Sequence, residues 1–155
     1  MRLFLDTNVL IDYFGRRKPF MEGLIQLRIM QLMGDVELWA SAKSFTDIFY
    51  ILRGQVDGDK LQMAFGECLS FLRICSIDGK DIAECSQRGW ADFEDCLIDR
   101  AAQKVRADMI LTRDAKGFEK SSIPRKSVAE FIRWMDKEWG ISYDAVPAVT
   151  NLDEL

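Results

Sequence analysis

Four aspartates lie where a folded chain can gather carboxylates in one place. Asp6 and Asp114 each follow a short apolar run of the kind that forms a buried strand. Asp47 and Asp95 lie in the first turns of two expected helices, beside apolar residues. Carboxylates brought together repel one another, and burying them is costly unless they are paired or bind a metal. Carboxylates without histidine or thiolate ligands select hard ions, so we expect a site for Mg²⁺ or Mn²⁺.

Each of these aspartates also has a simpler interpretation. Asp6 is a candidate helix N-cap, and Asp114 is a candidate turn residue. Asp92, Asp95 and Asp99 share one helix face, because residues three and four apart align there. We interpret Asp95 as the main ligand, Asp92 as the cap and a second candidate ligand, and Asp99 as structural.

The composition excludes several catalytic chemistries. There is no histidine in the sequence, so a Ser-His-Asp triad or a Cys-His pair cannot form. The four cysteines lack CxxC spacing, which disfavours a zinc site and predicts buried, reduced thiols. Acid–base chemistry near neutral pH therefore requires a shifted carboxylate, lysine or cysteine, or water bound to a metal.

Charge balance and the length of the apolar runs limit the partners and the compartment. The net charge is −4 and the pI is near 4.9, unlike a strongly basic nucleic-acid binder. Attraction to a nucleic acid would therefore have to come from local basic patches. The apolar run after Met1 is too short for a signal peptide, and no run approaches the ~20 apolar residues of a membrane span. We expect a cytoplasmic protein without a membrane partner.

Short apolar runs alternate with helical patterns along the chain. Strands are expected at residues 2–5, 36–40, 74–77 and 109–112. Helices are expected after the capping residues 6–8 and at about 19–33, 41–53, 57–72, 80–88, 92–105 and 127–139. This alternation predicts an α/β fold, a three-layer α/β/α sandwich around a short, mostly parallel central sheet. We expect one domain at residues 1–139 and a C-terminal tail at 140–155.

Four segments together resemble a known family. Leu5–Asp12 resembles the opening motif of PIN (PilT N-terminus-like) domains, the nuclease fold of VapC-type bacterial toxins. Residues 41–52 resemble the second acidic motif in one bacterial branch of that family, 92–97 the third and 110–114 the fourth. The motifs occur in family order and, with their flanking elements, span residues 3 to about 135.

This resemblance implies a metal-dependent ribonuclease of the toxin type. Its acidic cluster would be Asp6, Asp47, Asp95 and Asp114, and its products would carry a 5′-phosphate and a 3′-hydroxyl. One departure is Asp47, because the wider family usually has glutamate in the second motif. Polar residues that commonly support such a cluster match Asn8, Ser44 and Thr112.

The resemblance also implies partners. Besides an RNA substrate, we expect a small antitoxin protein that inserts a segment near the acidic cleft. A homodimer is expected, with the apolar faces of residues 19–33 and 57–72 as candidate surfaces that serve equally well as core. The candidates for holding the RNA backbone are Arg53, Arg113 and Lys116, followed by Lys120, Arg125 and Lys126.

Two other functions stay open. A phosphatase of the haloacid-dehalogenase type would use Asp6 as nucleophile, but Asn8 stands where the second, acidic aspartate would be needed. Such an enzyme would form a trapped aspartyl-phosphate. The other alternative is a non-catalytic PIN-like module that binds RNA or a protein and cuts no RNA under any divalent metal.

Overall fold

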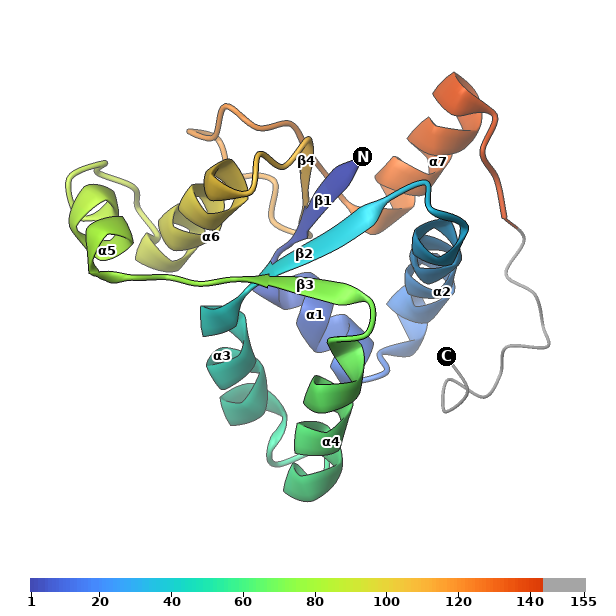
Figure 1. Cartoon of the computed structure of the whole chain (residues 1–155), viewed down its shortest axis with the longest axis horizontal. Coiled ribbons are helices and arrows are strands. Elements are labelled where there is room, and N and C mark those ends of the chain that lie inside the picture. Colours follow the sequence, from blue (N-terminus) through green and yellow to red (C-terminus); the bar gives the residue numbers. More distant parts are fainter. Residues whose placement is uncertain (144–155) are drawn as a thin grey trace.

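The computed structural model describes residues 1–143, which contain one five-stranded parallel sheet (Figure 1). The strand order is β3-β2-β1-β4-β5, and each neighbouring pair is parallel. Because parallel strands end on the same side, Asp6 after β1 and Thr112 after β4 lie at one end of the sheet. The strands are β1 (Arg2–Leu5), β2 (Glu37–Ser41), β3 (Leu72–Cys75), β4 (Met109–Leu111) and β5 (Arg125–Lys126).

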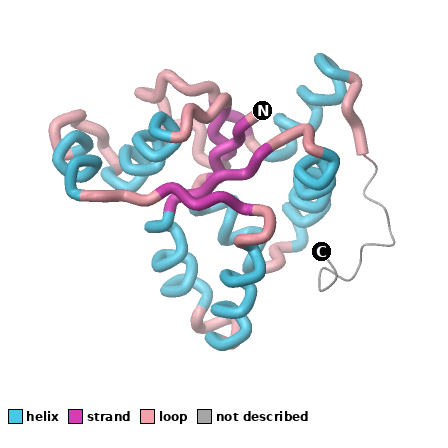
Figure 2. Tube along the Cα trace, viewed as in Figure 1, coloured by secondary structure: helices cyan, strands magenta, loops and turns pink. Residues whose placement is uncertain are grey.

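Helices cover both faces of this sheet (Figure 2). One face carries α6, and the other carries α1, α2 and α7, while α3 and α4 project beyond α1 (Figure 1). The arrangement confirms the predicted three-layer sandwich. The helices are α1 (Thr7–Phe14), α2 (Lys18–Met33), α3 (Ala42–Leu52), α4 (Gly58–Cys68), α5 (Gly79–Cys85), α6 (Phe93–Lys104) and α7 (Val128–Trp139).

Side-chain alternation along the central strands divides the core in two. Leu3 and Leu5 point into the larger apolar cluster beneath α1, α2 and α7. Phe4 points to the opposite face, where it joins Ile98 of α6 and Ile110 of β4 in a second cluster. All five side chains are buried, so both faces of the short strands are covered, as a parallel sheet requires.

Two helices begin immediately where strands end. Asp6 is the N-cap of α1, and Ser41, the last residue of β2, is the N-cap of α3. Asp92 caps α6 in the same way, with an extended backbone and a side chain that accepts amide hydrogen bonds. Polar residues in these first turns are therefore held over the carboxyl end of the sheet.

The element boundaries differ from the predicted ones in the middle and near the end of the chain. Helix α4 ends at Cys68, whereas the prediction ran to Leu72. Strand β3 begins two residues earlier than predicted, because Leu72 is buried and pairs with Leu38 of β2. Strand β5 was not predicted, since Arg125–Lys126 has no apolar pattern and is defined only by its pairing with β4.

The chain after α7 folds back onto the domain as far as it is described. Gly140 ends α7 in a left-handed conformation, with φ of 63°. Ile141 then packs against the larger core cluster, and the Tyr143 hydroxyl donates a 2.8 Å hydrogen bond to Asp35 Oδ2. The rest of the predicted tail, residues 144–155, lies outside the described residues, and a boundary at residue 139 stays a prediction. None of the described helices combines the length and apolar character needed to cross a membrane.

Candidate active site

Asp6 is the most buried carboxylate at the carboxyl end of the sheet, with 2% of its surface exposed. Its Oδ1 accepts a 2.6 Å hydrogen bond from the Thr7 amide, which is the capping contact. Its Oδ2 accepts hydrogen bonds from Asn8 Nδ2 at 2.6 Å and from Thr112 Oγ1 at 2.7 Å. Burial raises the pKa of Asp6 to about 6, against the lowering effect of the hydrogen bonds from Thr112 and from the Thr7 amide, with the charges of Glu94 and Asp114 adding to the rise.

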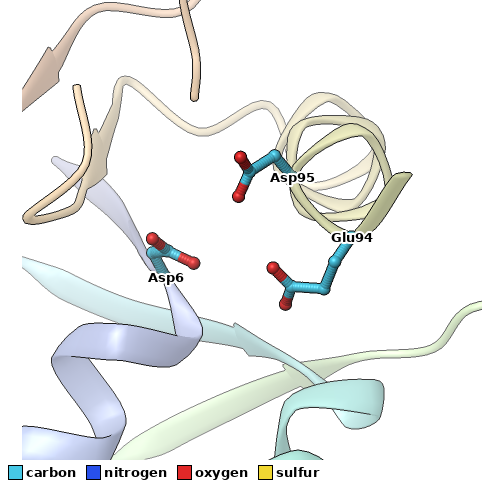
Figure 3. Close-up of side chains that lie close together, drawn as sticks. All are labelled: Asp6, Glu94 and Asp95. Atoms are coloured by element: carbon cyan, nitrogen blue, oxygen red, sulfur yellow. The ribbon is translucent and has the colours of Figure 1, made fainter. Parts of the chain in front are cut away.

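The start of α6 brings two further carboxylates toward Asp6. Asp92 Oδ1 accepts hydrogen bonds from the amides of Glu94, at 2.8 Å, and Asp95, at 3.4 Å, which confirms its predicted capping role. Carboxylate oxygens of Asp6, Glu94 and Asp95 all lie within 4.8 Å of one another. Figure 3 shows the three side chains pointing into one space between β1 and α6. We call these three residues the acidic trio.

Asp95 has the most perturbed carboxylate of the site. Burial raises its pKa to about 7, and the nearby charges of Asp6, Asp92, Glu94 and Asp114 raise it further. The side chain is 9% exposed, so water screens this repulsion weakly. The trio therefore accumulates negative charge that its own hydrogen bonds do not neutralise.

Glu94 belongs to the site, although no role was predicted for it from the sequence. Its Oε1 accepts a 2.7 Å hydrogen bond from Thr7 Oγ1, and Thr7 Oγ1 lies 2.8 Å from Ser44 Oγ. Ser44, predicted as a supporting residue, is thus connected to Glu94 through the Thr7 hydroxyl group. The available sequence signal was only that Glu94 precedes Asp95 in the first turn of the expected helix, and of these two residues only Asp95 was predicted to be a ligand.

Asp114 lies at the exposed border of the trio. Its amide donates a 2.8 Å hydrogen bond to Thr112 Oγ1, and its Oδ1 accepts one of 3.1 Å from the Gly117 amide. Thr112 consequently links Asp114 to Asp6 through its hydroxyl group. A Cβ atom on Gly117 would lie 2.2 Å from Asp95 Oδ2 and 3.2 Å from Asp114 Oδ2, so the Gly117 backbone packs directly against both carboxylates.

Asp47 faces the same space from α3 but is not part of the trio. Its side chain is 37% exposed and forms an ion pair with Lys43, one helical turn earlier. Lys43 Nζ also lies 3.4 Å from Glu94 Oε1. Burial lowers the pKa of Lys43, but its hydrogen bond to Asp47 and the charge of Glu94 raise it more. The ammonium thus offsets part of the negative charge of the site.

Two cavities meet at the acidic residues. The larger, of about 470 Å³, is lined by Asp6, Asp95 and residues of α1 and α3. The smaller, of about 360 Å³, extends toward Trp90 and the loop of residues 116–120. Both are lined by Asp92, Asp95 and Asp114, so the carboxylates stand between two hollows in the surface.

The basic residues predicted to hold RNA have different surroundings. Arg113 pairs with the buried Asp12 at 2.8 Å and lies over the Phe20 ring, so its guanidinium already has partners. Lys116 is exposed and lines the smaller cavity. Arg53 lies over the ring of Tyr50, with 4.4 Å between its guanidinium carbon and the ring centroid.

Three further charged residues with predicted roles are engaged elsewhere. Asp99 is buried against Arg88, Gln103 and Ser121, in agreement with its predicted structural role. The Lys120 ammonium and the Arg125 guanidinium each donate to a backbone carbonyl oxygen, those of Gly89 and Ala115 respectively.

The family model described as PIN domain matches residues 2–116, which include all four predicted catalytic aspartates and the acidic trio. This chain belongs to the PIN-domain family. The match confirms the resemblance carried by the four motifs and overturns the haloacid-dehalogenase alternative.

Relatives of this PIN domain cover nearly its whole described length. Ribonuclease VapC1 of Aquifex aeolicus (strain VF5) is 25% identical over 139 residues, 86% of this chain and 95% of the relative. The toxin–antitoxin complex from Klebsiella pneumoniae has a chain that is 25% identical, with a TM-score of 0.56 over 81% of this chain and 97% of its own.

Two more solved structures share the fold of this PIN domain. VapBC-1 from nontypeable Haemophilus influenzae gives a TM-score of 0.61 at 18% identity, covering 83% of this chain and 99% of that one. VapBC2 from Rickettsia felis, bound to a DNA fragment from its promoter, gives 0.60 at 18% identity, covering 82% and 98%. At this identity the likeness concerns the fold alone.

The donor set of this PIN domain fits a hard divalent cation. The trio offers carboxylate oxygens close enough to share one ion, and Asp114 adds another at the border. A cation at this point would relieve the repulsion that raises the pKa values of Asp6 and Asp95. Oxygen donors of this kind match Mg²⁺ or Mn²⁺ better than softer metals.

Proposed function

We propose that this PIN domain is a divalent-metal-dependent endoribonuclease that hydrolyses RNA phosphodiester bonds, and that it acts as the toxin of a toxin–antitoxin pair. The convergence of Asp6, Glu94 and Asp95 is the observation that carries the proposal. The ribonuclease identity of the Aquifex relative supports the activity. The toxin–antitoxin complex from Klebsiella supports the biological role.

The proposed metal is Mg²⁺ or Mn²⁺, held by Asp6, Asp95 and Glu94 with Asp114 at the border. Asp92 and Asp47, which line the same cavity, are further candidate ligands. When bound, such an ion lowers the pKa of water and offsets charge on a phosphodiester. Asn8 and Thr112 orient Asp6 for that role through their hydrogen bonds, and Ser44 does the same for Glu94 through Thr7.

The remaining residues of the site have proposed roles toward the RNA. Asp47 lines the same cavity from α3, and its proposed role is to orient a water molecule for attack on the phosphodiester. Lys116, which lines the smaller cavity, and Arg53, which lies over the Tyr50 ring beside the larger one, are candidates for phosphate contacts. The Arg113 side chain is paired with Asp12, so its proposed contribution to RNA binding is indirect, by fixing the segment that follows β4. The products would be a 5′-phosphate and a 3′-hydroxyl.

The decisive experiment is digestion of single-stranded RNA with Mg²⁺, with Mn²⁺ and with EDTA. We expect cleavage only with the metals, and a loss of at least ~100-fold for Asp6→Asn, since Asp6 is the carboxylate most completely oriented by its neighbours. The control is Asp136→Asn, an exposed aspartate of α7 outside the matched PIN region. Metal-dependent cleavage that is equal in Asp6→Asn and wild type would refute the assignment. RNA binding without cleavage would favour the non-catalytic alternative.

The proposed partners are a small antitoxin and a second copy of this chain. Large apolar side chains exposed on or beside α2 and α4 are candidates for the dimer contact: Leu32, Met33, Met63 and Leu69. Light scattering should then report a dimer that Met63→Glu converts to a monomer. For the antitoxin, co-expression with the product of an adjacent short reading frame should abolish RNA cleavage. A monomeric wild type, or cleavage unaffected by that product, would remove the respective partner from the proposal.

A further inference from the structure

The rim of the larger cavity carries two exposed apolar side chains that the proposed chemistry does not use. Tyr50 is 66% exposed and Ile51 is 43% exposed, yet both line the cavity that holds the acidic trio. Burying such side chains is favourable, so their exposure at the mouth of a site marks a contact surface for whatever enters it.

Helix periodicity places this rim in line with the acidic residues. Lys43, Asp47 and Tyr50 fall on one face of α3, because they are four and three residues apart. At 1.5 Å per residue, Tyr50 lies ~10 Å along the helix axis from Lys43. The face thus runs from the pairing of Lys43 with Glu94, at the trio, outward to the tyrosine ring.

The Tyr50 ring is already held from one side. The Arg53 guanidinium lies over it, with the guanidinium carbon 4.4 Å from the ring centroid, and Arg53 itself closes α3 as its C-cap. Within residues 1–143, the Tyr50 hydroxyl makes no hydrogen bond that would direct the ring elsewhere. The pair is therefore an aromatic surface beside a cation, which suits a flat base attached to a phosphate.

The charge of the cavity favours a base contact on this rim over a phosphate contact alone. Among the described residues that line it, Lys43 is the only cation, and six carboxylates line the same hollow, those of Asp6, Asp47, Asp92, Glu94, Asp95 and Asp114. A phosphate backbone entering this hollow is repelled except where a metal or Arg53 offsets the charge. Stacking on an aromatic ring carries no such penalty, because every base presents an uncharged face.

We propose, building on the ribonuclease function above, that Tyr50 stacks the nucleobase next to the scissile phosphate of a single-stranded RNA. In this arrangement the RNA strand runs across the carboxylates from one cavity to the other, so the cleaved bond is internal to the RNA. One nucleoside next to that bond then lies in the cavity lined by α3. Tyr50 is in this sense a positioning residue for the substrate. Stacking of one base on an aromatic side chain strengthens RNA binding roughly five- to 150-fold, so a variant without the Tyr50 ring should bind RNA measurably more weakly.

The direct test uses a single-stranded RNA heptamer that carries one 2-aminopurine, whose fluorescence falls when it stacks. The base is moved along the heptamer, and each version is bound to Asp6→Asn protein in Mg²⁺. Quenching should appear at one position, persist in Asp6→Asn/Tyr50→Phe and disappear in Asp6→Asn/Tyr50→Ala. Asp6→Asn/Trp139→Ala, which removes an equally exposed aromatic of α7, should quench as the parent does. Unchanged quenching in the Tyr50→Ala protein would overturn the proposal.

Cleavage kinetics separate this inference from the activity it builds on. Tyr50→Ala should raise KM about tenfold and change kcat little, and an abasic ribose at the stacked position should raise wild-type KM equally while leaving Tyr50→Ala unaffected. If Tyr50→Ala and the abasic ribose instead raise KM independently, so that their combined effect is the product of the separate effects, the stacking role of Tyr50 is overturned. If no RNA is cut while the quenching pattern holds, the ribonuclease proposal fails and the base site stands. If Tyr50→Ala abolishes binding of a co-expressed protein and leaves both RNA measurements unchanged, the rim is a protein interface.

Discussion

Thr7 Oγ1 donates a 2.7 Å hydrogen bond to Glu94 Oε1, which joins the start of α1 to the start of α6. The contact directs the Glu94 carboxylate toward Asp6 and Asp95 rather than toward solvent. It also ties Ser44 of α3 to the same carboxylate through Thr7. Three helices that are distant in sequence thus position one side chain of the candidate metal centre.

Glu94→Gln should weaken metal binding by ~10–100-fold, because the amide keeps the size and a hydrogen-bond acceptor but loses the charge. Titration calorimetry with Mn²⁺ measures this directly. Glu138→Gln, on the far helix α7, serves as the matched control and should bind as wild type does. Unaltered affinity in Glu94→Gln would remove Glu94 from the ligand set.

The metal-free protein should lose stability as the pH rises from about 4 to 7. The pKa values of Asp6, about 6, and Asp95, about 7, lie above the unfolded value near 3.8, so the native state binds protons more tightly. Stability is therefore greatest when both are protonated, falls through this range and levels off above it. Thermal melts in EDTA across pH 4–8 test the slope, and saturating Mn²⁺ should reverse the loss at pH 8.

Asp95→Asn should stabilise the metal-free protein at pH 8, where the native carboxylate is ionised among like charges. A gain on the order of 1–3 kcal/mol is expected from removing that repulsion, while RNA cleavage is lost. At pH 4, where Asp95 is protonated in the folded state, the variant and wild type should melt alike. If Asp95→Asn is less stable than wild type at pH 8, other residues of the chain must already offset the repulsion between Asp95 and its neighbouring carboxylates.

Thr112→Val should shift metal binding to higher pH. Thr112 Oγ1 donates to Asp6 Oδ2, which lowers the pKa of Asp6 against the effect of burial, and its loss lets that pKa rise. Because a metal binds the deprotonated carboxylate, the midpoint of Mn²⁺ binding against pH moves upward. Thr46→Val, which removes only a contact to the Lys43 carbonyl oxygen, is the control. An unchanged midpoint would contradict the role given to Thr112.

Gly117→Ala should reduce activity while preserving the fold. The added carbon would lie 2.2 Å from Asp95 Oδ2, so either the loop or the Asp95 carboxylate must move to make room. A shift of about 1 Å in a catalytic group can lower the rate ~100-fold. Circular dichroism and a cleavage assay on the same samples separate the two effects. At Gly54 the same substitution meets no atom of the described residues within 4 Å, so Gly54→Ala should remain active.

The local pattern of the chain was enough to predict the layers of the fold and part of the site. Apolar runs such as residues 3–5 identify buried strands, and capping residues such as Asp6 and Asp92 mark where helices begin. These signals work because strand burial and helix capping involve residues only a few positions apart. They also place Asp6 and Thr112 at strand ends, which in a parallel sheet lie on one side.

The partners of the charged side chains were decided by the tertiary structure. The sequence pointed to Asp95 and gave Glu94 no role, and only the packing of α6 against β1 and α1 turns both side chains toward Asp6. In the same way, Arg113 pairs with Asp12, a hundred positions away, rather than standing free for RNA. Electrostatic contacts depend on distance in space and on burial, which a linear pattern does not encode. The chain itself therefore supplies the carboxylates and the elements that carry them, while the fold selects which of them meet.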